Sequence, residues 1–463
     1  MATGHPPQST HESPPTLFCL PYAGGGASAY QSMRAALSGT AEVVALNLPG
    51  REGRIAEPPR VSIGEIADEM APATGRPYAV YGHSMGARIA FEVVRELRRR
   101  ALPMPVRLYV GGAHPPDRRV PLAAAVGLAD EAFIEQLVRR AGALTELRDV
   151  PELRELLLPL LRSDFTWIKE YRYAPEPPLD VPLVAFAGLD DAEVPAPVML
   201  GWSRHTRSRF RLRTVRGGHL FLADAHADLP RLIAEDLAAG DPAGGRAEGP
   251  PGAAPPAEDE VHVWLAARET SPGRLVEEVL RRYGTARRSL RHGADRHDGL
   301  ALAAVSRDCA VGVAVERLRV PGVPGDAFDD ALLHADEREQ IEDAAEEDRP
   351  WLALRARTAK RALAEGSGAA PDRIGFADLT APGPWRPFAH RVPGPPPPDR
   401  DTRAAGVADP VPPPGDGPPV PDLTGWQVVH LPLRVPRGEA VAAVALPRDR
   451  MRLRFDTLTD GLR

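Results

Sequence analysis

Lysine and cysteine are scarce in this chain of 463 residues. Lys169 and Lys360 are the only lysines, so arginine supplies nearly all of the 57 basic side chains. The 63 acidic residues give a formal net charge of −6, which argues against nucleic acid as the main partner. Cys19 and Cys309 lie far apart without metal-type spacing. We expect both to be small buried hydrophobes in a reducing compartment.

Long apolar runs are also absent. No run approaches the length that spans a membrane, and the first 15 residues are polar and proline-rich, unlike a signal peptide. We therefore expect a cytoplasmic protein without a membrane partner. The 52 prolines and 42 glycines cluster and divide the chain. The predicted parts are a disordered leader 1–13, a first domain 14–240, a linker 241–259, and a second domain 260–455 with a proline-rich insertion 394–421.

The first domain is organised around Gly82-His83-Ser84-Met85-Gly86. Residues 78–81 predict a buried strand, and residues 87–100 have the apolar spacing of a helix. A serine at the tip of a tight turn between a strand and a helix is the arrangement of a nucleophile elbow. Side chains at the two glycine positions would collide with the neighbouring helix and strand. We therefore predict that Ser84 is a nucleophile rather than part of a merely structural turn.

Apolar runs alternate with helical patterns through the rest of this domain. Such alternation predicts an α/β fold with a mostly parallel sheet. The predicted strands are 16–20, 42–46, 78–81, 106–111, 183–187 and 210–215. Residues 128–172 interrupt this pattern with apolar residues at helical intervals and no strand. They predict a helical lid over the site, the alternative being a helical cap that only buries core.

Three loops carry the remaining catalytic candidates. The glycine-rich loop after the first strand lacks the Gly-Lys-Ser/Thr ending of a phosphate-binding loop. We instead expect the backbone N–H of Ala23 in this loop to form an oxyanion hole with that of Met85. His219 follows the last strand, and Asp190 and Asp191 follow the strand before it. An imidazole can accept the proton of Ser84, and a carboxylate can orient that imidazole. We favour Asp191 over Asp190 because it lies three residues after Gly188.

With these residues identified, residues 14–240 resemble the type II thioesterases, the stand-alone editing hydrolases of polyketide and nonribosomal peptide assembly lines. The matching segments are 17–25, 47–54, 164–165, 202–206 and 218–222, with Tyr22 where the family often has histidine. The resemblance implies an α/β-hydrolase fold with a helical lid and no cofactor. The implied substrate is an acyl group held as a thioester on the phosphopantetheine arm of an acyl or peptidyl carrier protein.

The second domain resembles a degenerate phosphopantetheinyl transferase of the two-lobed bacterial type, a small α+β protein. The matching segments are 289–292, 311–318 and 355–360. Ala314 and Ala356 stand where two of the three carboxylates for Mg²⁺ are expected, and only Glu316 remains. No metal site and no transferase activity are therefore expected. Arg355 and Lys360 remain as candidates for holding coenzyme A phosphates. The alternative is an unrelated small α+β domain.

These features predict a serine thioesterase of antibiotic biosynthesis that acts on carrier-protein thioesters. A generic esterase and a chain-releasing cyclase are rival enzymes. A carrier-protein docking protein is an alternative of another class, and a bifunctional thioesterase and phosphopantetheinyl transferase is a third possibility.

Overall fold

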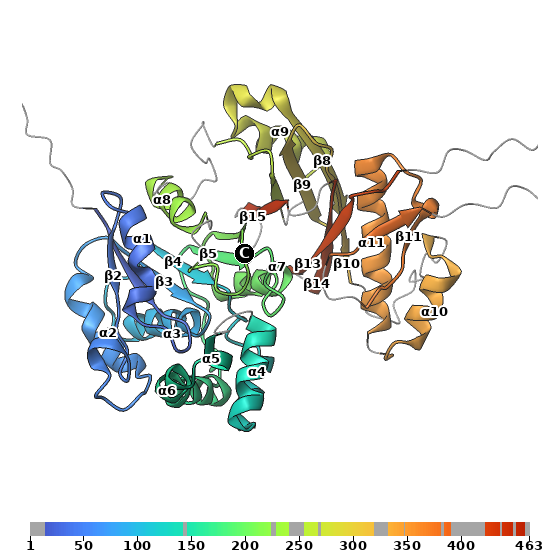
Figure 1. Ribbon diagram of the computed structural model, residues 1–463. Helices are drawn as coiled ribbons and strands as arrows, with labels where there is room; N and C mark the ends of the chain where they lie inside the picture. The colour runs from blue at the N-terminus through green and yellow to red at the C-terminus, as the bar shows by residue number, and fades with distance from the viewer. Residues whose placement is uncertain are drawn as a thin grey trace, which may run out of the picture. The chain divides into compact units, whose positions relative to one another are not determined.

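The chain forms two compact units in the computed structural model (Figure 1). The first comprises Met1–Ala247, Arg452–Thr459 and Arg463, and the second comprises Glu248–Met451 and Asp460–Leu462. The structure describes residues 14–141, 146–223, 228–239, 254–266, 270–318, 332–346, 348–380, 384–389, 422–435, 438–447 and 451–458. The predicted leader, the insertion 394–421 and most of the linker lie outside these ranges. Within them, no helix is long and apolar enough to cross a membrane.

A sheet with the strand order β2-β1-β3-β4-β5-β6-β15 forms the centre of the first unit. Neighbouring strands from β2 to β6 are parallel. These strands are β1 (Thr16–Leu20), β2 (Glu42–Ala45), β3 (Tyr78–His83), β4 (Arg107–Gly111), β5 (Leu183–Gly188) and β6 (Phe210–Val215). The central strands are buried along their whole length, as in parallel sheets that are covered on both faces. The predicted α/β fold with a mostly parallel sheet is confirmed.

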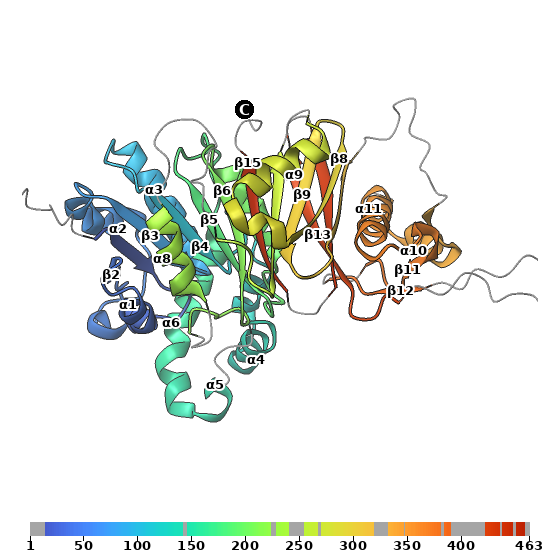
Figure 2. The ribbon, with the colours of Figure 1, turned by 90° about the horizontal axis from the view of Figure 1, so that it is seen from above.

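Helices cover both faces of this sheet. Met33 of α1 and Ile233 of α8 pack with Tyr81 and Phe186 in one buried apolar cluster, so α1 and α8 lie on the same face. Helix α3, which begins directly after Ser84, and its neighbour α2 lie on the other face (Figure 2). The bounds are α1 (Gln31–Ala36), α2 (Ile63–Met70), α3 (Met85–Arg99), α7 (Ala196–Met199) and α8 (Leu229–Ala239).

Helices also occupy the region between β4 and β5 where a lid is predicted. They are α4 (Asp130–Ala141), α5 (Glu146–Asp149) and α6 (Pro151–Glu170). Pro151 stands in the first turn of α6, where its missing N–H removes no helical hydrogen bond. The apolar side chains of Leu161 and Phe165 on α6 are buried, and Phe165 contacts Phe133 of α4 edge to face.

The last strand of the chain, β15 (Arg452–Leu458), belongs to the first unit and not to the second. It lies beside β6 (Figure 2) and pairs antiparallel with it. In this register Asp456 lies opposite Arg211. Asp456 is fully buried and accepts a hydrogen bond of 2.7 Å from Arg211 Nε. Asp236 of α8 accepts a second bond from Arg211, at 2.6 Å, and one of 2.7 Å from Arg107. The sequence predicts a second domain that extends to residue 455. In the structure, residues 452–455 are instead part of β15 and belong to the sheet of the first unit.

The second unit contains two halves with the same topology. In the first half a strand, a helix and two further strands follow in order, and the last strand pairs antiparallel with both others, giving β7-β9-β8. The second half has the same strand arrangement, β10-β14-β13, but adds α10 before α11 and the strand pair β11–β12 after it. The bounds are β7 (Glu260–Ala266), α9 (Pro272–Arg281), β8 (Leu290–His297), β9 (Leu300–Arg307), β10 (Gly312–Arg317), α10 (Ala335–Asp343), α11 (Arg349–Ser367), β11 (Ile374–Phe376), β12 (Pro387–Ala389), β13 (Gln427–Val435) and β14 (Gly438–Leu446).

Residues 300–305 and 311–315 also suggest a hairpin around Arg307-Asp308, and this expectation is wrong. β9 pairs with β7 and β8, whereas β10 pairs with β14. The short connection therefore joins the two halves. Two strands that are close in sequence often form a hairpin. Here each strand instead pairs with strands of its own half.

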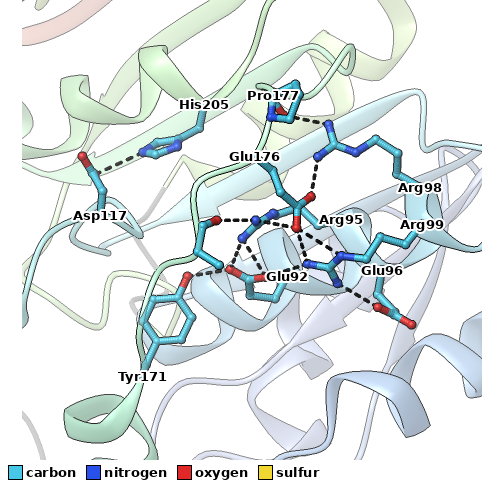
Figure 3. A network of polar contacts seen from close by, with 11 residues as sticks. Glu92, Arg95, Glu96, Arg98, Arg99, Asp117, Tyr171, Glu176, Pro177 and His205 are labelled. Atoms are coloured by element: carbon cyan, nitrogen blue, oxygen red, sulfur yellow. Dashed lines mark hydrogen bonds and ion pairs between the residues drawn. The ribbon is translucent and has the colours of Figure 1, made fainter.

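An arginine-rich end of α3 holds the segment that follows the lid (Figure 3). The carboxylate of Glu176 lies 2.7 Å from guanidinium nitrogens of Arg95, Arg98 and Arg99. Partial burial alone raises the pKa of Glu176, but the hydrogen bonds from these three arginines outweigh it and lower the pKa to about 2. The network ties the C-terminal side of the lid to the helix that begins next to Ser84.

The buried charge on β15 leads to a first prediction. Replacement Asp456→Asn leaves Arg211 buried with Asp236 as its remaining carboxylate partner. We expect a loss of about 3 kcal/mol, at the low end for a broken buried pair because Asp236 is retained. Hydrogen exchange of the slowest amides in β5 and β6 measures the loss in the first unit. The exposed Asp180→Asn is the matched control, and a change as small as in this control would contradict the account of β15.

The Glu176 network leads to a prediction about pH. Because the folded-state pKa lies below the usual value, the contribution of Glu176 to stability is complete above about pH 5 and is lost as the pH falls toward 2. Glu176→Gln should therefore be less stable than the unsubstituted protein at pH 7, and this difference should shrink between pH 5 and pH 3. Urea midpoints at each pH measure the difference. A difference that is the same at pH 7 and pH 3 would refute the ion-pair explanation, and the exposed Glu155→Gln serves as control.

Candidate active site

Ser84 lies in a tight turn between Gly82 and Gly86, and neither of these two positions has room for a side chain. A Cβ atom at Gly82 would lie 2.1 Å from the carbonyl oxygen of Gly86, and one at Gly86 would lie 2.1 Å from that of Leu20. Ser84 itself has a φ of 52° and a ψ of −112°, a strained backbone for a residue with a side chain. Its N–H donates to the carbonyl of Gly111 at 2.8 Å, which fixes the turn against β4. The predicted strand, turn and helix are all present.

Ser84, His219 and Asp191 form a continuous chain of hydrogen bonds. Ser84 Oγ lies 3.0 Å from His219 Nε2, and His219 Nδ1 lies 2.9 Å from Asp191 Oδ2. The other carboxylate oxygen of Asp191 accepts from the backbone N–H of Glu193 and Val194, each at 2.9 Å. Burial alone raises the pKa of Asp191, but these bonds and the nearby imidazole outweigh it and lower the pKa. Asp190 is exposed, so Asp191 is the acid that reaches His219.

His83 holds the backbone of His219, a contact that the sequence does not reveal. His83 Nε2 lies 2.8 Å from the carbonyl oxygen of His219, and His83 Nδ1 lies 2.9 Å from the hydroxyl of Tyr81. Burial lowers the pKa of His83 to about 3, so its ring is neutral near pH 7. A neutral ring that donates from Nε2 and accepts at Nδ1 satisfies both neighbours. The only sequence signal is its position directly before Ser84.

The glycine-rich loop is fixed by a buried ion pair. Arg51 and Asp164 are joined by two hydrogen bonds of 2.9 and 3.1 Å, and their side chains are 2% and 0% exposed. Arg51 also donates to the carbonyl of Gly25 at 2.9 Å, while Asp164 accepts from the N–H of Gly24 at 2.8 Å. Because Asp164 lies on α6, the same pair connects the loop that contains Ala23 to the lid.

A cavity of about 700 Å³, including its open mouth, lies over Ser84. Ala23 and Met85, the residues predicted to supply the oxyanion-hole N–H groups, both line it. Lid helices contribute apolar side chains, so the lid region covers the site as well as burying core. The lining residues are Tyr22, Ala23, Ser84, Met85, Arg88, Gly112, Ala113, His114, Val120, Leu122, Leu137, Leu161, Phe165, Ile168, Glu193, Val194, His219 and Leu220.

The candidates in the second unit are engaged by protein groups. Lys360 is buried, and its Nζ lies 2.6 Å from Glu337 Oε2 and 2.7 Å from the carbonyl of Leu332. Arg355 lies over the ring of Trp385, 4.4 Å from the centroid, and burial lowers its pKa. Glu316 accepts a hydrogen bond of 2.8 Å from Arg357. Within the described ranges, no three His, Cys, Asp or Glu side chains are placed to hold a metal ion.

Comparison with known proteins finds matches to the N-terminal half of the chain. A family profile described as "Thioesterase domain" matches residues 15–237. Gramicidin S biosynthesis protein GrsT of Aneurinibacillus migulanus is 36% identical over 227 residues, which cover 48% of this chain and 88% of that protein. Thioesterase PikA5 of Streptomyces venezuelae is 36% identical over 227 residues, which cover 48% of this chain and 80% of that protein.

Among solved structures, RedJ thioesterase from the prodiginine biosynthetic pathway of Streptomyces coelicolor is 33% identical. The match covers 50% of this chain and 90% of that one, with a TM-score of 0.45. The family profile confirms an α/β-hydrolase-type thioesterase fold for the N-terminal half of the chain. One of these relatives is named for gramicidin S biosynthesis, and another is named a thioesterase. Because it is 36% identical to GrsT over 227 residues that cover 88% of that protein, and because the thioesterase profile matches residues 15–237, the chain belongs to the thioesterase family.

Proposed function

We propose that the first unit is a type II thioesterase that releases acyl groups from the phosphopantetheine arm of acyl or peptidyl carrier proteins. The observation that carries this proposal is the hydrogen-bonded chain from Ser84 through His219 to Asp191, under a cavity with a largely apolar lining. The relative named for gramicidin S biosynthesis, and the similar solved thioesterase YbtT, which is named for the yersiniabactin NRPS/PKS pathway, support a place in polyketide or nonribosomal peptide biosynthesis. Carrier proteins of such pathways are the partners in this proposal, and the cytoplasm is the location.

Ser84 is the nucleophile and His219 is the base. Ser84 Oγ attacks the thioester carbonyl carbon while His219 Nε2 takes the hydroxyl proton, and Asp191 stabilises the resulting imidazolium. The backbone N–H groups of Ala23 and Met85 donate to the oxyanion. The C–S bond then breaks, and the phosphopantetheine sulfur leaves with the proton from His219. A water molecule attacks the acyl-serine, again with His219 as base, and yields the free acid and Ser84.

We propose that the second unit is a phosphopantetheinyl transferase-like domain without transferase activity. Its two halves of equal topology support the two-lobed resemblance. Glu316 forms an ion pair with Arg357, and Lys360 forms one with Glu337. These contacts support the absence of catalysis, because both side chains already have partners within the unit. Ala314 and Ala356, where the resemblance expects carboxylates, are fully buried and have no side-chain oxygen to offer a metal.

The thioesterase proposal predicts a specific product. Incubation with acetyl-phosphopantetheinyl carrier protein should yield carrier protein that has lost the acetyl group and kept the arm, as measured by intact mass. Ser84→Ala should be slower by about a thousandfold or more, because the covalent step is lost. The exposed Ser38→Ala is the matched control and should keep the full rate. Hydrolysis that survives in Ser84→Ala, or a preference for a simple nitrophenyl ester over the carrier protein, would contradict the proposal.

A further inference from the structure

We propose that His114 and Glu193 form a polar subsite in the acyl cavity, which selects acyl groups that carry a hydroxyl close to the thioester carbonyl. This inference rests on the proposed function and adds a substrate class to it. Neither side chain belongs to the hydrogen-bonded chain of Ser84, His219 and Asp191, although the backbone N–H of Glu193 donates to Asp191.

The two side chains approach each other in the wall of the cavity. His114 lies three residues after β4, and Glu193 lies two residues after Asp191. Both line the cavity, with side chains only 12% and 4% exposed. His114 Nε2 and Glu193 Oε1 are 3.8 Å apart. Within the part of the chain that the structure describes, His114 Nε2 is buried and makes no hydrogen bond.

The surroundings make this pair conspicuous. The lid and the loop before it present mainly aliphatic and aromatic side chains to the cavity, among them Leu122, Leu137 and Phe165. A buried polar group costs free energy when it lacks a partner, so a ligand that hydrogen-bonds to it is favoured over one that does not. His114 Nε2 is already shielded from solvent, and a purely alkyl chain would leave it without a hydrogen bond.

A hydroxyl matches the pair better than other substituents. It can donate to the carboxylate of Glu193 and accept from the Nε2–H of His114. A separation of 3.8 Å is too long for a direct hydrogen bond and short enough for one oxygen atom to lie within reach of both. A carboxylate substituent would be repelled by Glu193. An ammonium would share the cavity with Arg88, whose pKa is lowered only to about 10 by burial, so that it stays charged at neutral pH.

The position of the subsite places the hydroxyl near the reacting carbon. The N–H of Glu193 donates to Asp191 Oδ1 at 2.9 Å. Gly112, two residues before His114, lies close to the backbone of His219. A Cβ atom at position 112 would lie 3.3 Å from the carbonyl oxygen of His219. Both residues are thus within a few chain positions of groups that contact His219, which points to the 2- or 3-position of the acyl chain.

The test compares acyl groups of nearly equal size on one carrier protein. The substrates are butyryl, 2-hydroxybutyryl, 3-hydroxybutyryl and 2-aminobutyryl thioesters, and the measured quantity is kcat/KM relative to butyryl. We expect at least one hydroxyacyl thioester to be preferred about tenfold or more. Glu193→Met and His114→Leu should each bring this ratio close to one, whereas Glu193→Gln, which still accepts a hydrogen bond, should retain part of it.

Outcomes for the subsite and for the thioesterase proposal are separable. Failure to hydrolyse any of the four thioesters would refute the proposed function itself. Hydrolysis of butyryl and hydroxybutyryl thioesters at equal kcat/KM would refute only the subsite. A preference that persists in Glu193→Met and His114→Leu, or a preference for the 2-aminobutyryl thioester, would also refute it. The exposed Glu155→Gln should show the unsubstituted protein's ratio.

Discussion

The close backbone approach around Ser84 is the constraint on which the rest of the site depends. Gly82 and Gly86 let β3, the turn and the loop after β1 come together at distances that exclude any Cβ atom. The strained backbone of Ser84, a cost of about 1–3 kcal/mol, is compensated by a sheet that is buried on both faces. Parallel strands end at the same edge, so Asp191 and His219 arrive there from neighbouring strands and complete a chain that no local segment could form.

Buried polar contacts then hold each part of the site in place. His83 fixes the backbone of His219, and the Arg51–Asp164 pair fixes the glycine-rich loop. Because Asp164 is on the lid helix, the position of the loop and that of the lid are linked through one ion pair. Farther away, Asp456 on β15 joins the arginines of the sheet. A shortened chain without the second unit therefore has to retain β15, since removing it would leave the Arg211 guanidinium with one carboxylate partner fewer.

What the sequence predicts well is local or ordered along the chain. The turn around Ser84 is predicted from the five consecutive residues 82–86. Ser84, Asp191 and His219 are predicted as partners because each follows a predicted strand, in that order along the chain. Contacts between segments that are distant along the chain could not be predicted from the sequence. Asp456 meets Arg211 across 245 residues, and nothing near either residue marks the pairing. The hairpin expected around Arg307-Asp308 fails for the same reason, because partners of β9 and β10 come from elsewhere in the unit. His114 and Glu193 likewise become neighbours only in the folded chain.

The claim that Ser84 forms a covalent acyl intermediate can be tested most directly by trapping it. An acyl carrier protein thioester is mixed with the enzyme and quenched in acid within milliseconds, and the enzyme is analysed by intact and peptide mass spectrometry. The mechanism predicts a mass increase equal to the acyl group, located on the peptide that contains Ser84 and absent from Ser84→Ala. If Ser84→Ala still turns over the thioester without forming this adduct, the mechanism is contradicted. An adduct on another residue of the unsubstituted enzyme would contradict it as well.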